Sequence, residues 1–173
     1  TLQAHQRSSF TFLYGKRASA TKSWGLGVSY SYTFGTQAIY PVFAYSKRFT
    51  ERLSLETILP VNARLKYFFK EKNVINLLAK FEGDKYNLNF DNLESKTLFL
   101  DKSDLFLTIA YEREIYDFIW LSFTTGFRTN INFDLYESNQ FFANTTPEIS
   151  NKLQDTGFLK VGLFLVPPRK WLE

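Results

Sequence analysis

Hydrophobic and small polar residues alternate one by one along residues 24–34 of this chain. The even positions carry aromatic or aliphatic side chains, and the odd positions carry only Gly, Ser and Thr. A period of two is typical of a β-strand with one apolar face. The other face lacks the Lys and Glu that are usual beside solvent, which predicts that it borders a confined interior. The apolar face consists of Trp24, Leu26, Val28, Tyr30, Tyr32 and Phe34.

The same alternation predicts seven further strands. They cover residues 8–14, 38–48, 53–69, 74–82, 105–112, 118–135 and 156–166. In several of them one face is nearly free of charge, and its apolar members include Leu65, Tyr67, Leu121, Phe123, Leu159, Val161 and Leu163. Pro60 leaves two interpretations of 53–69, because proline cannot donate to a sheet ladder. It either sits at a bulge in one long strand or divides the segment into two strands.

The connections between these strands differ in length. The gaps 35–37, 70–73 and 113–117 are short, whereas 15–23, 83–104 and 136–155 are longer, and only 49–52 breaks this alternation. Bacterial outer-membrane barrels combine short periplasmic turns with longer extracellular loops. We therefore predict an all-β, antiparallel, up-and-down transmembrane β-barrel of about eight strands, formed by residues 1–173 as a single domain. An even strand count places both termini at the periplasmic side.

The fold must close if it lies in lipid, because each unpaired backbone group in hydrocarbon costs several kcal/mol. An interior of eight strands is just wide enough for side chains to fill. Opposite charges inside it are expected to pair, since an isolated buried charge is costly. The alternative is a polar path for a small solute. The predicted interior charge network comprises Arg64, Lys66, Lys80, Glu82, Glu112, Arg128 and Lys160, with Glu56 and Asp134 nearby.

Composition agrees with alternation and excludes several other classes. Aromatic residues make up 18% of the 173 residues, yet the mean hydropathy is −0.23. No apolar run approaches the ~18 residues of a helical membrane span. Cysteine is absent, which excludes a disulfide framework, and the net charge of +4 gives only weak attraction to anionic head groups. The chain starts at Thr1 and has no methionine, so we expect a mature or truncated product whose targeting peptide has been removed.

The sequence provides little for catalysis, metals or nucleic acids. The single histidine, His5, precedes the first predicted strand, and there is no nucleophile-elbow motif. We expect no catalytic residues, no cofactor and no metal site. Acidic residues do gather in the predicted loop 83–104, where a solvated loop is the simpler explanation than a cation site: Asp84, Asp91, Glu94, Asp101 and Asp104. Aromatic and basic residues in 66–70 fit an interfacial belt better than base stacking, so no nucleic acid is expected.

The pattern of the chain resembles small bacterial outer-membrane β-barrels. The stretch LETILPVNARLKYFFKEKNVINLLAKFEGDKYNL (55–88) is similar to uncharacterised barrels of Bacteroidetes-type bacteria. Lys160, Gly162 and Leu165 match the order of a barrel's terminal strand, although Pro167 and the ending PPRKWLE depart from it. The resemblance implies a place in the bacterial outer membrane. It also implies contact with outer-membrane lipid and lipopolysaccharide and insertion by the barrel-assembly machinery.

Three functions remain open on sequence grounds. The first is a non-catalytic structural or interaction barrel, acting as a subunit of a larger complex with other outer-membrane proteins. The second is a barrel that binds or passes a small ligand. The third is a soluble lipocalin-like carrier, in which the apolar residues face inward. The small residues Gly25, Gly27, Gly126 and Gly162 share the face opposite the apolar one. This pattern favours the arrangement with the apolar face toward lipid.

Overall fold

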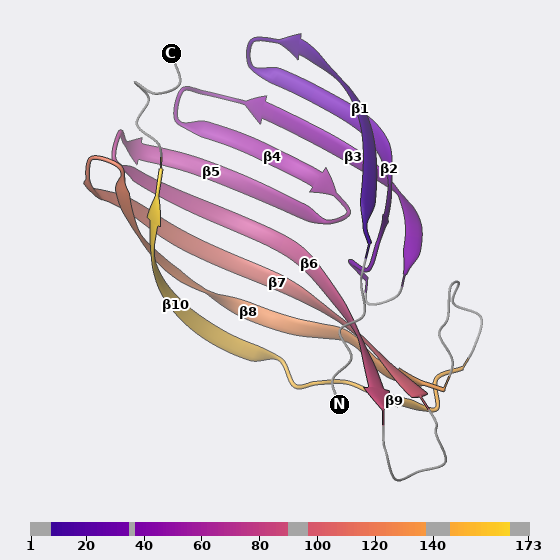
Figure 1. Cartoon of the computed structure of the whole chain (residues 1–173). Helices are drawn as coiled ribbons and strands as arrows, with labels where there is room; N and C mark the ends of the chain where they lie inside the picture. Colours follow the sequence, from indigo (N-terminus) through magenta and orange to yellow (C-terminus); the bar gives the residue numbers. More distant parts are fainter. Residues whose placement is uncertain (1–7, 35–36, 90–96, 138–145, 167–173) are drawn as a thin grey trace.

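The computed structural model describes residues 8–34, 37–89, 97–137 and 146–166. These residues form one antiparallel sheet of 10 strands (Figure 1). Among them no helix is long and apolar enough to cross a membrane. The strands are β1 (Phe10–Ser19), β2 (Lys22–Ser31), β3 (Ala38–Arg48), β4 (Leu53–Leu59), β5 (Asn62–Lys70), β6 (Asn73–Asn89), β7 (Thr97–Tyr116), β8 (Ile119–Tyr136), β9 (Ile149–Asn151) and β10 (Thr156–Leu165).

The sheet has an up-and-down order. Each strand pairs with its neighbour in the sequence from β1 to β8, then β8 pairs with β10, and the short β9 pairs with β8 off this path. The predicted all-β, antiparallel, up-and-down class is confirmed at this level. The sheet is not closed, since β1 and β10 form its two edges (Figure 1). Closure into a barrel remains a prediction.

The strand count of about eight is wrong because residues 53–69 form two strands and the short β9 lies in the predicted connection 136–155. β4 and β5 join in a tight turn at Pro60 and Val61, and Leu55 lies opposite Leu65 in their register. Partners in this hairpin are both odd-numbered or both even-numbered, as Leu53 and Tyr67 also show. The alternation of apolar and polar positions therefore continues through the turn with the apolar residues still at odd positions. The sequence pattern of such a hairpin is the same as that of one long strand.

This additional strand changes which connections share an end of the sheet. The turns 20–21, 49–52, 71–72 and 117–118 lie at one end, which we call the turn end. At the opposite end, which we call the loop end, β2 is followed by β3, β4 by β5, β6 by β7, and β8 by β9 and β10. The connection 49–52 therefore lies with the other short turns and no longer breaks the alternation of short and long connections. The connection between β2 and β3, predicted as 35–37 among the short turns, belongs to the loop end. The path from edge to edge contains nine strands, because β9 lies off it. β1 therefore starts at the loop end and β10 finishes at the turn end, and the prediction that both ends of the sheet path lie together is wrong for the described sheet.

Several predicted boundaries also change. The predicted strand 24–34 ends at Ser31, and the predicted gap 15–23 shrinks because β1 continues to Ser19. Most of the predicted loop 83–104 is strand, since β6 and β7 extend to Asn89 and from Thr97. The charged residues there have the composition of a loop, but the backbones of β6 and β7 pair through this region as neighbouring strands. Pro41 is tolerated in β3 because the pairing of β3 with β4 starts only at Phe43.

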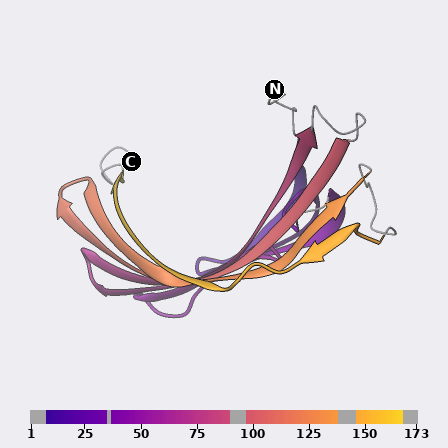
Figure 2. The same ribbon diagram turned by 90° about the horizontal axis from the view of Figure 1, so that it is seen from below.

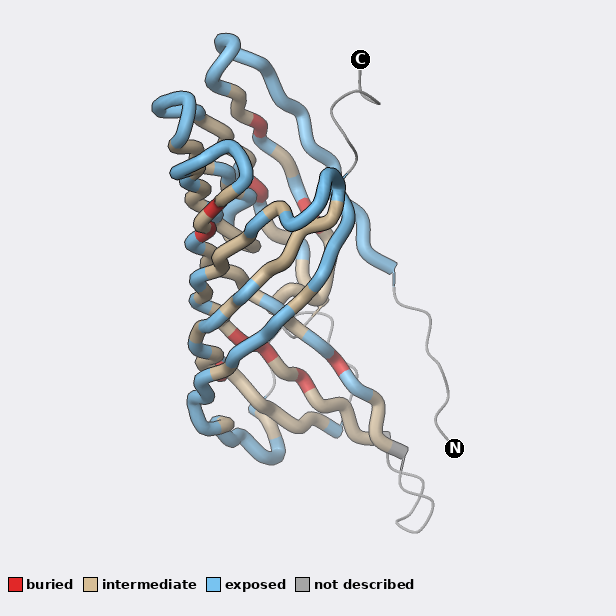
Figure 3. Tube along the Cα trace, turned by 90° about the vertical axis from the view of Figure 1, so that its left-hand side faces the viewer, coloured by how far each residue is buried: buried red, intermediate tan, exposed pale blue. Residues whose placement is uncertain are grey.

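The sheet bends strongly into a trough (Figure 2). Few residues along the described chain are buried (Figure 3), and the residue types that are buried are the reverse of those in a soluble domain. Among the described residues, Val42 and Val74 are the only buried hydrophobic side chains, whereas seven polar or charged ones are buried. The core of a conventional folded domain is thus missing from the described sheet.

Candidate functional site

The convex face of the sheet is apolar from one edge to the other. The register places Leu65 beside Leu77 and Leu77 beside Ile109, and the row continues through Thr125 to Leu159 on β10. Ile109 is 53% exposed and Leu159 is 76% exposed. Large apolar side chains are therefore open to the surroundings on every strand of the path. Contiguous exposed apolar surface of this extent is unusual for a soluble monomer.

Most of the residues predicted to face lipid lie on this apolar face. The cross-strand register unites there Trp24, Leu26, Val28, Tyr30, Leu65, Tyr67, Leu121, Phe123, Leu159, Val161 and Leu163. Tyr32 and Phe34 differ, because they follow the end of β2 and lie in the turn. The Phe34 ring packs edge-on against Tyr40, with 5.1 Å between centroids. Contact of this face with lipid stays a prediction.

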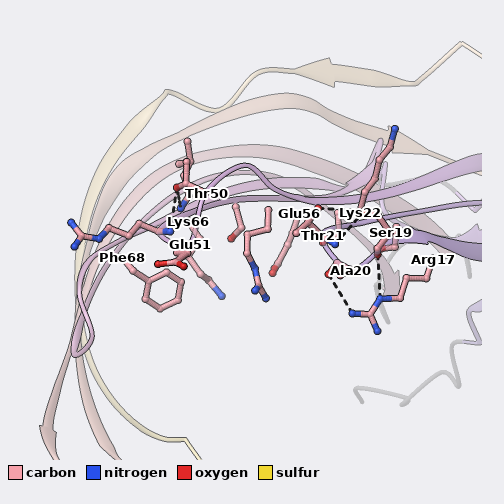
Figure 4. A pocket seen from close by; sticks show the side chains of 16 residues that line it. Arg17, Ser19, Ala20, Thr21, Lys22, Thr50, Glu51, Glu56, Lys66 and Phe68 are labelled. Carbon is pink, nitrogen blue, oxygen red and sulfur yellow. Dashed lines mark hydrogen bonds between the residues drawn. The ribbon is translucent and has the colours of Figure 1, made fainter.

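The concave face is polar. The register places on it Arg64, Lys66, Lys80, Glu82, Glu112, Arg128 and Lys160, which are the residues of the predicted interior network. Figure 4 shows Arg17, Glu56 and Lys66 beneath the arch of the ribbons, inside the curve. The curvature thus brings the predicted charged residues onto one inner surface.

Ion pairs on the inner surface are confined to one half of the sheet. Lys80 and Glu82 of β6 are 2.6 Å apart, and Lys102 and Asp104 of β7 are 2.9 Å apart. At the turn end, Lys72 lies 3.1 Å from Glu114. Within the described chain the other residues of the predicted network make no ion pair, and this includes Arg64 opposite Glu56. A network that connects all seven residues stays a prediction.

The half of the inner surface formed by β1 to β5 instead contains a basic hollow (Figure 4). Its volume is about 570 Å³, and it opens near the turn end between β1 and β5. Lys22 borders the hollow, but its ammonium lies 5.7 Å from the Tyr45 ring on the convex side. The other lining cations, on the inner side, outnumber the two Glu side chains and leave an excess of two positive charges. Local patterning does not mark this hollow, because these cations come from three strands and a turn. They are Arg17, Arg48, Arg52 and Lys66.

A second feature that the sequence did not predict is a buried polar cluster where β6, β7 and β8 extend beyond β10. Asn130 is fully buried, and its Nδ2 donates to the backbone oxygen of Ser103 at 3.1 Å and to Oδ1 of Asp104 at 2.9 Å. Its Oδ1 accepts a hydrogen bond from the backbone N–H of Leu153 at 3.0 Å. Asn130 therefore ties the segment that leads into β10 to the β7–β8 ladder.

The same extension buries a charge pair. Lys85 and Asp101 lie 3.3 Å apart, and both side chains are almost completely buried. The Lys85 ammonium also lies 5.5 Å from the centre of the Phe99 ring. Beside them, burial raises the pKa of Tyr136 above 10.0, with further contributions from Asp134 and Asp101. These buried polar groups hold together the parts of β6, β7 and β8 that extend beyond β10.

Nothing in the described ranges assembles metal ligands, since no group of three or more His, Asp or Glu side chains converges there. Asp84, Asp101 and Asp104 belong to strands rather than to the predicted loop. His5, Asp91 and Glu94 lie outside the described residues. The absence of catalytic and cofactor-binding residues remains a prediction.

Two glycines of the inner face provide a matched test of the close strand packing there. A Cβ at Gly27 would lie 2.9 Å from the Leu13 Cα, whereas a Cβ at Gly162 would have no atom within 4 Å. We expect Gly27→Ala to lower the free energy of unfolding by about 1–3 kcal/mol, because the backbone of β1 would have to move. Gly162→Ala should change it by less than about 0.5 kcal/mol. Urea unfolding measures both, and equal effects would contradict the register of β1 on β2.

Taken as a class, the described chain is an all-β protein built as a curved up-and-down sheet, with a polar inner and an apolar outer face. It belongs to the family described as a domain of unknown function, DUF6268, whose profile matches residues 9–165. The match covers all the strands of the sheet. Comparison with curated proteins and with solved structures found no match for the chain.

Proposed function

We propose that this chain is the wall of a transmembrane β-barrel in the bacterial outer membrane, with a structural or interaction role and no catalytic activity. The observation that carries the proposal is the reversed distribution of side chains. Ile109 and Leu159 on the convex face are more than half exposed, whereas Asn76 and Ser29 on the concave face are buried. Exposure of this apolar face is unfavourable in water but favourable in contact with lipid chains.

Strand length and connection length also support a membrane location. β1, β2 and β10 each contain 10 residues, which matches the ~9–11 residues of a tilted membrane-spanning strand. Turns of two to four residues at the turn end oppose longer connections at the loop end, where all connections of the path but the β4–β5 turn have six or more residues. This asymmetry is characteristic of outer-membrane barrels, with the short turns in the periplasm.

The curvature argues against the soluble lipocalin-like alternative. A lipocalin-like carrier needs its apolar side chains on the concave face, around the ligand. Here the concave face carries Arg17, Glu56 and Lys66, and Leu107 lies on the convex one. Turning the sheet inside out would require every strand to shift its register by one residue.

A closed barrel requires hydrogen-bond partners for the backbone groups of both edge strands, β1 and β10. β1 and β10 run in the same direction, from the loop end to the turn end. Direct pairing of the two edges would be a parallel contact, whereas an added strand of opposite direction would pair with both in the antiparallel manner. Either arrangement satisfies the backbone groups that lipid cannot.

Gel mobility with and without boiling tests this proposal. The chain, extracted from membranes in a mild detergent, should migrate faster when it is not boiled, because a closed barrel resists unfolding by dodecyl sulfate. A protein that stays in the soluble fraction, with the same mobility in both samples, would contradict the membrane role.

A further inference from the structure

We infer that the basic hollow between β1 and β5 binds a phosphorylated small molecule through its phosphate monoester group. The inference does not depend on the proposed membrane role, because it concerns only the inner surface of the sheet. Three features of the hollow carry it: its unpaired cations, its hydroxyl floor and its size.

The cations of the hollow lack carboxylate partners. Arg48, Arg52 and Lys66 make no ion pair within the described part of the chain. On β6 and β7, by contrast, Lys80 and Lys102 are each paired with a carboxylate on their own strand. Like charges gathered on neighbouring strands repel one another, and a bound anion removes this cost.

The register places the cations around a floor of small hydroxyl side chains. Arg48 lies opposite Ser54, and Ser54 lies opposite Lys66, so the two cations flank one serine across three strands. In the next row, Arg17 lies opposite Ser23, and Ser23 lies opposite Ser46. These serines are half-buried, and none has a side-chain hydrogen bond in the described chain.

This set of groups matches a phosphate better than a carboxylate. Guanidinium forks, an ammonium and hydroxyl donors suit three anionic oxygens that point in different directions. The excess of two positive charges on the inner side suits a dianion. The separation of Arg48 and Lys66 by two strand spacings, roughly 10 Å, leaves room for a phosphate between their long side chains.

The hollow is larger than a phosphate ion alone requires. Its volume of about 570 Å³ falls in the range typical of small-molecule sites, ~300–1,000 Å³. Phe68 also lines it and offers an apolar contact for the body that carries the phosphate. The Lys66 ammonium lies 6.0 Å from the centre of the Phe68 ring, so the charged and apolar contacts are adjacent.

Calorimetric titration of the purified full chain with phenyl phosphate tests the inference, with benzoate and phenol as comparison ligands. We expect phenyl phosphate to bind more tightly than benzoate, and phenol not to bind. Arg48→Gln and Lys66→Gln should each weaken binding about tenfold, the scale for losing one charge-assisted contact. Lys47→Gln is the matched control, because Lys47 is next to Arg48 but faces the convex side opposite Leu55.

A variant that is expected to bind more tightly serves as a control, because poor folding cannot explain an increase in affinity. Glu56 is one of the two carboxylates of the hollow, so Glu56→Gln should tighten phenyl phosphate binding about threefold or more. A short-chain phosphatidic acid in mixed micelles forms the second arm of the experiment. Binding of phenyl phosphate alone identifies a soluble ligand, and binding of the phosphatidic acid alone identifies a lipid head group.

Three results would overturn the inference. They are the absence of binding to both phosphate probes, equal binding of benzoate and phenyl phosphate, and an equal loss of affinity in Lys47→Gln and Arg48→Gln. The last result would mean that the probe responds to net charge and not to the hollow. A chain without the gel-mobility shift that still binds phenyl phosphate would contradict only the membrane role.

Discussion

Replacing Ile109 with arginine should destabilise the protein in lipid vesicles by about 2–4 kcal/mol, the cost of a cation near the middle of a lipid-facing strand. Ile109 lies within the row of apolar side chains that crosses the convex face, and it is already 53% exposed. In water a half-exposed isoleucine on a sheet surface can be replaced by arginine at little cost. A large effect is thus expected only if lipid covers this face.

Ile115 provides the matched control for this prediction. It belongs to the same strand, is 56% exposed, and lies close to the turn end. Arginine there should cost about 0–1 kcal/mol, because the penalty decreases toward the membrane interface. Reversible urea unfolding from lipid vesicles gives both values. Equal and small effects at the two positions would mean that depth along the strand is irrelevant and that the convex face is not in lipid.

The second large effect is expected at Asn130. Asn130→Leu keeps a similar volume but removes the hydrogen bonds to Ser103, Asp104 and Leu153. The buried carboxylate and the backbone groups would lose their partners, and the free energy of unfolding should decrease by about 2–4 kcal/mol. The Leu153 amide should also exchange its hydrogen faster, because its acceptor is Asn130 Oδ1.

Asn62→Leu is the appropriate comparison for Asn130→Leu. Asn62 is half-buried at the start of β5, and its side chain makes no hydrogen bond to any described residue. Its replacement should change the free energy of unfolding by less than about 1 kcal/mol. If urea unfolding gave the same value for both variants, the buried polar cluster would not stabilise the projecting strands.

The two faces of the sheet could be predicted from the sequence, because the alternation within a strand does not depend on where the strand begins or ends. Trp24, Leu65 and Leu163 belong to the apolar side of their own strands, and the register brings these sides onto one face. The strand count could not be predicted in the same way. The turn at Pro60 preserves the parity of positions on both sides, so periodicity alone cannot separate β4 from β5.

The features missed by the sequence analysis depend on contacts between distant residues. The charged segment around Lys85 and Asp101 has the composition of a loop, but the register pairs the two side chains across β6 and β7. Asn130 acts through Leu153, far along the chain. The basic hollow likewise exists only once Arg17, Arg48 and Lys66 lie on adjacent parts of one curved surface. No local pattern marks such residues.

The most direct test of the account uses two adjacent positions of β7. Because the chain contains no cysteine, Leu107→Cys and Thr108→Cys each introduce a single thiol for an environment-sensitive fluorophore. Neighbouring residues of a strand point to opposite faces, and Leu107 lies on the apolar one. In vesicles the label at position 107 should emit at shorter wavelength and be quenched by brominated lipid, whereas the label at 108 should not. Equal quenching at both positions, or none at either, would contradict the claim that the convex face of this sheet contacts the membrane.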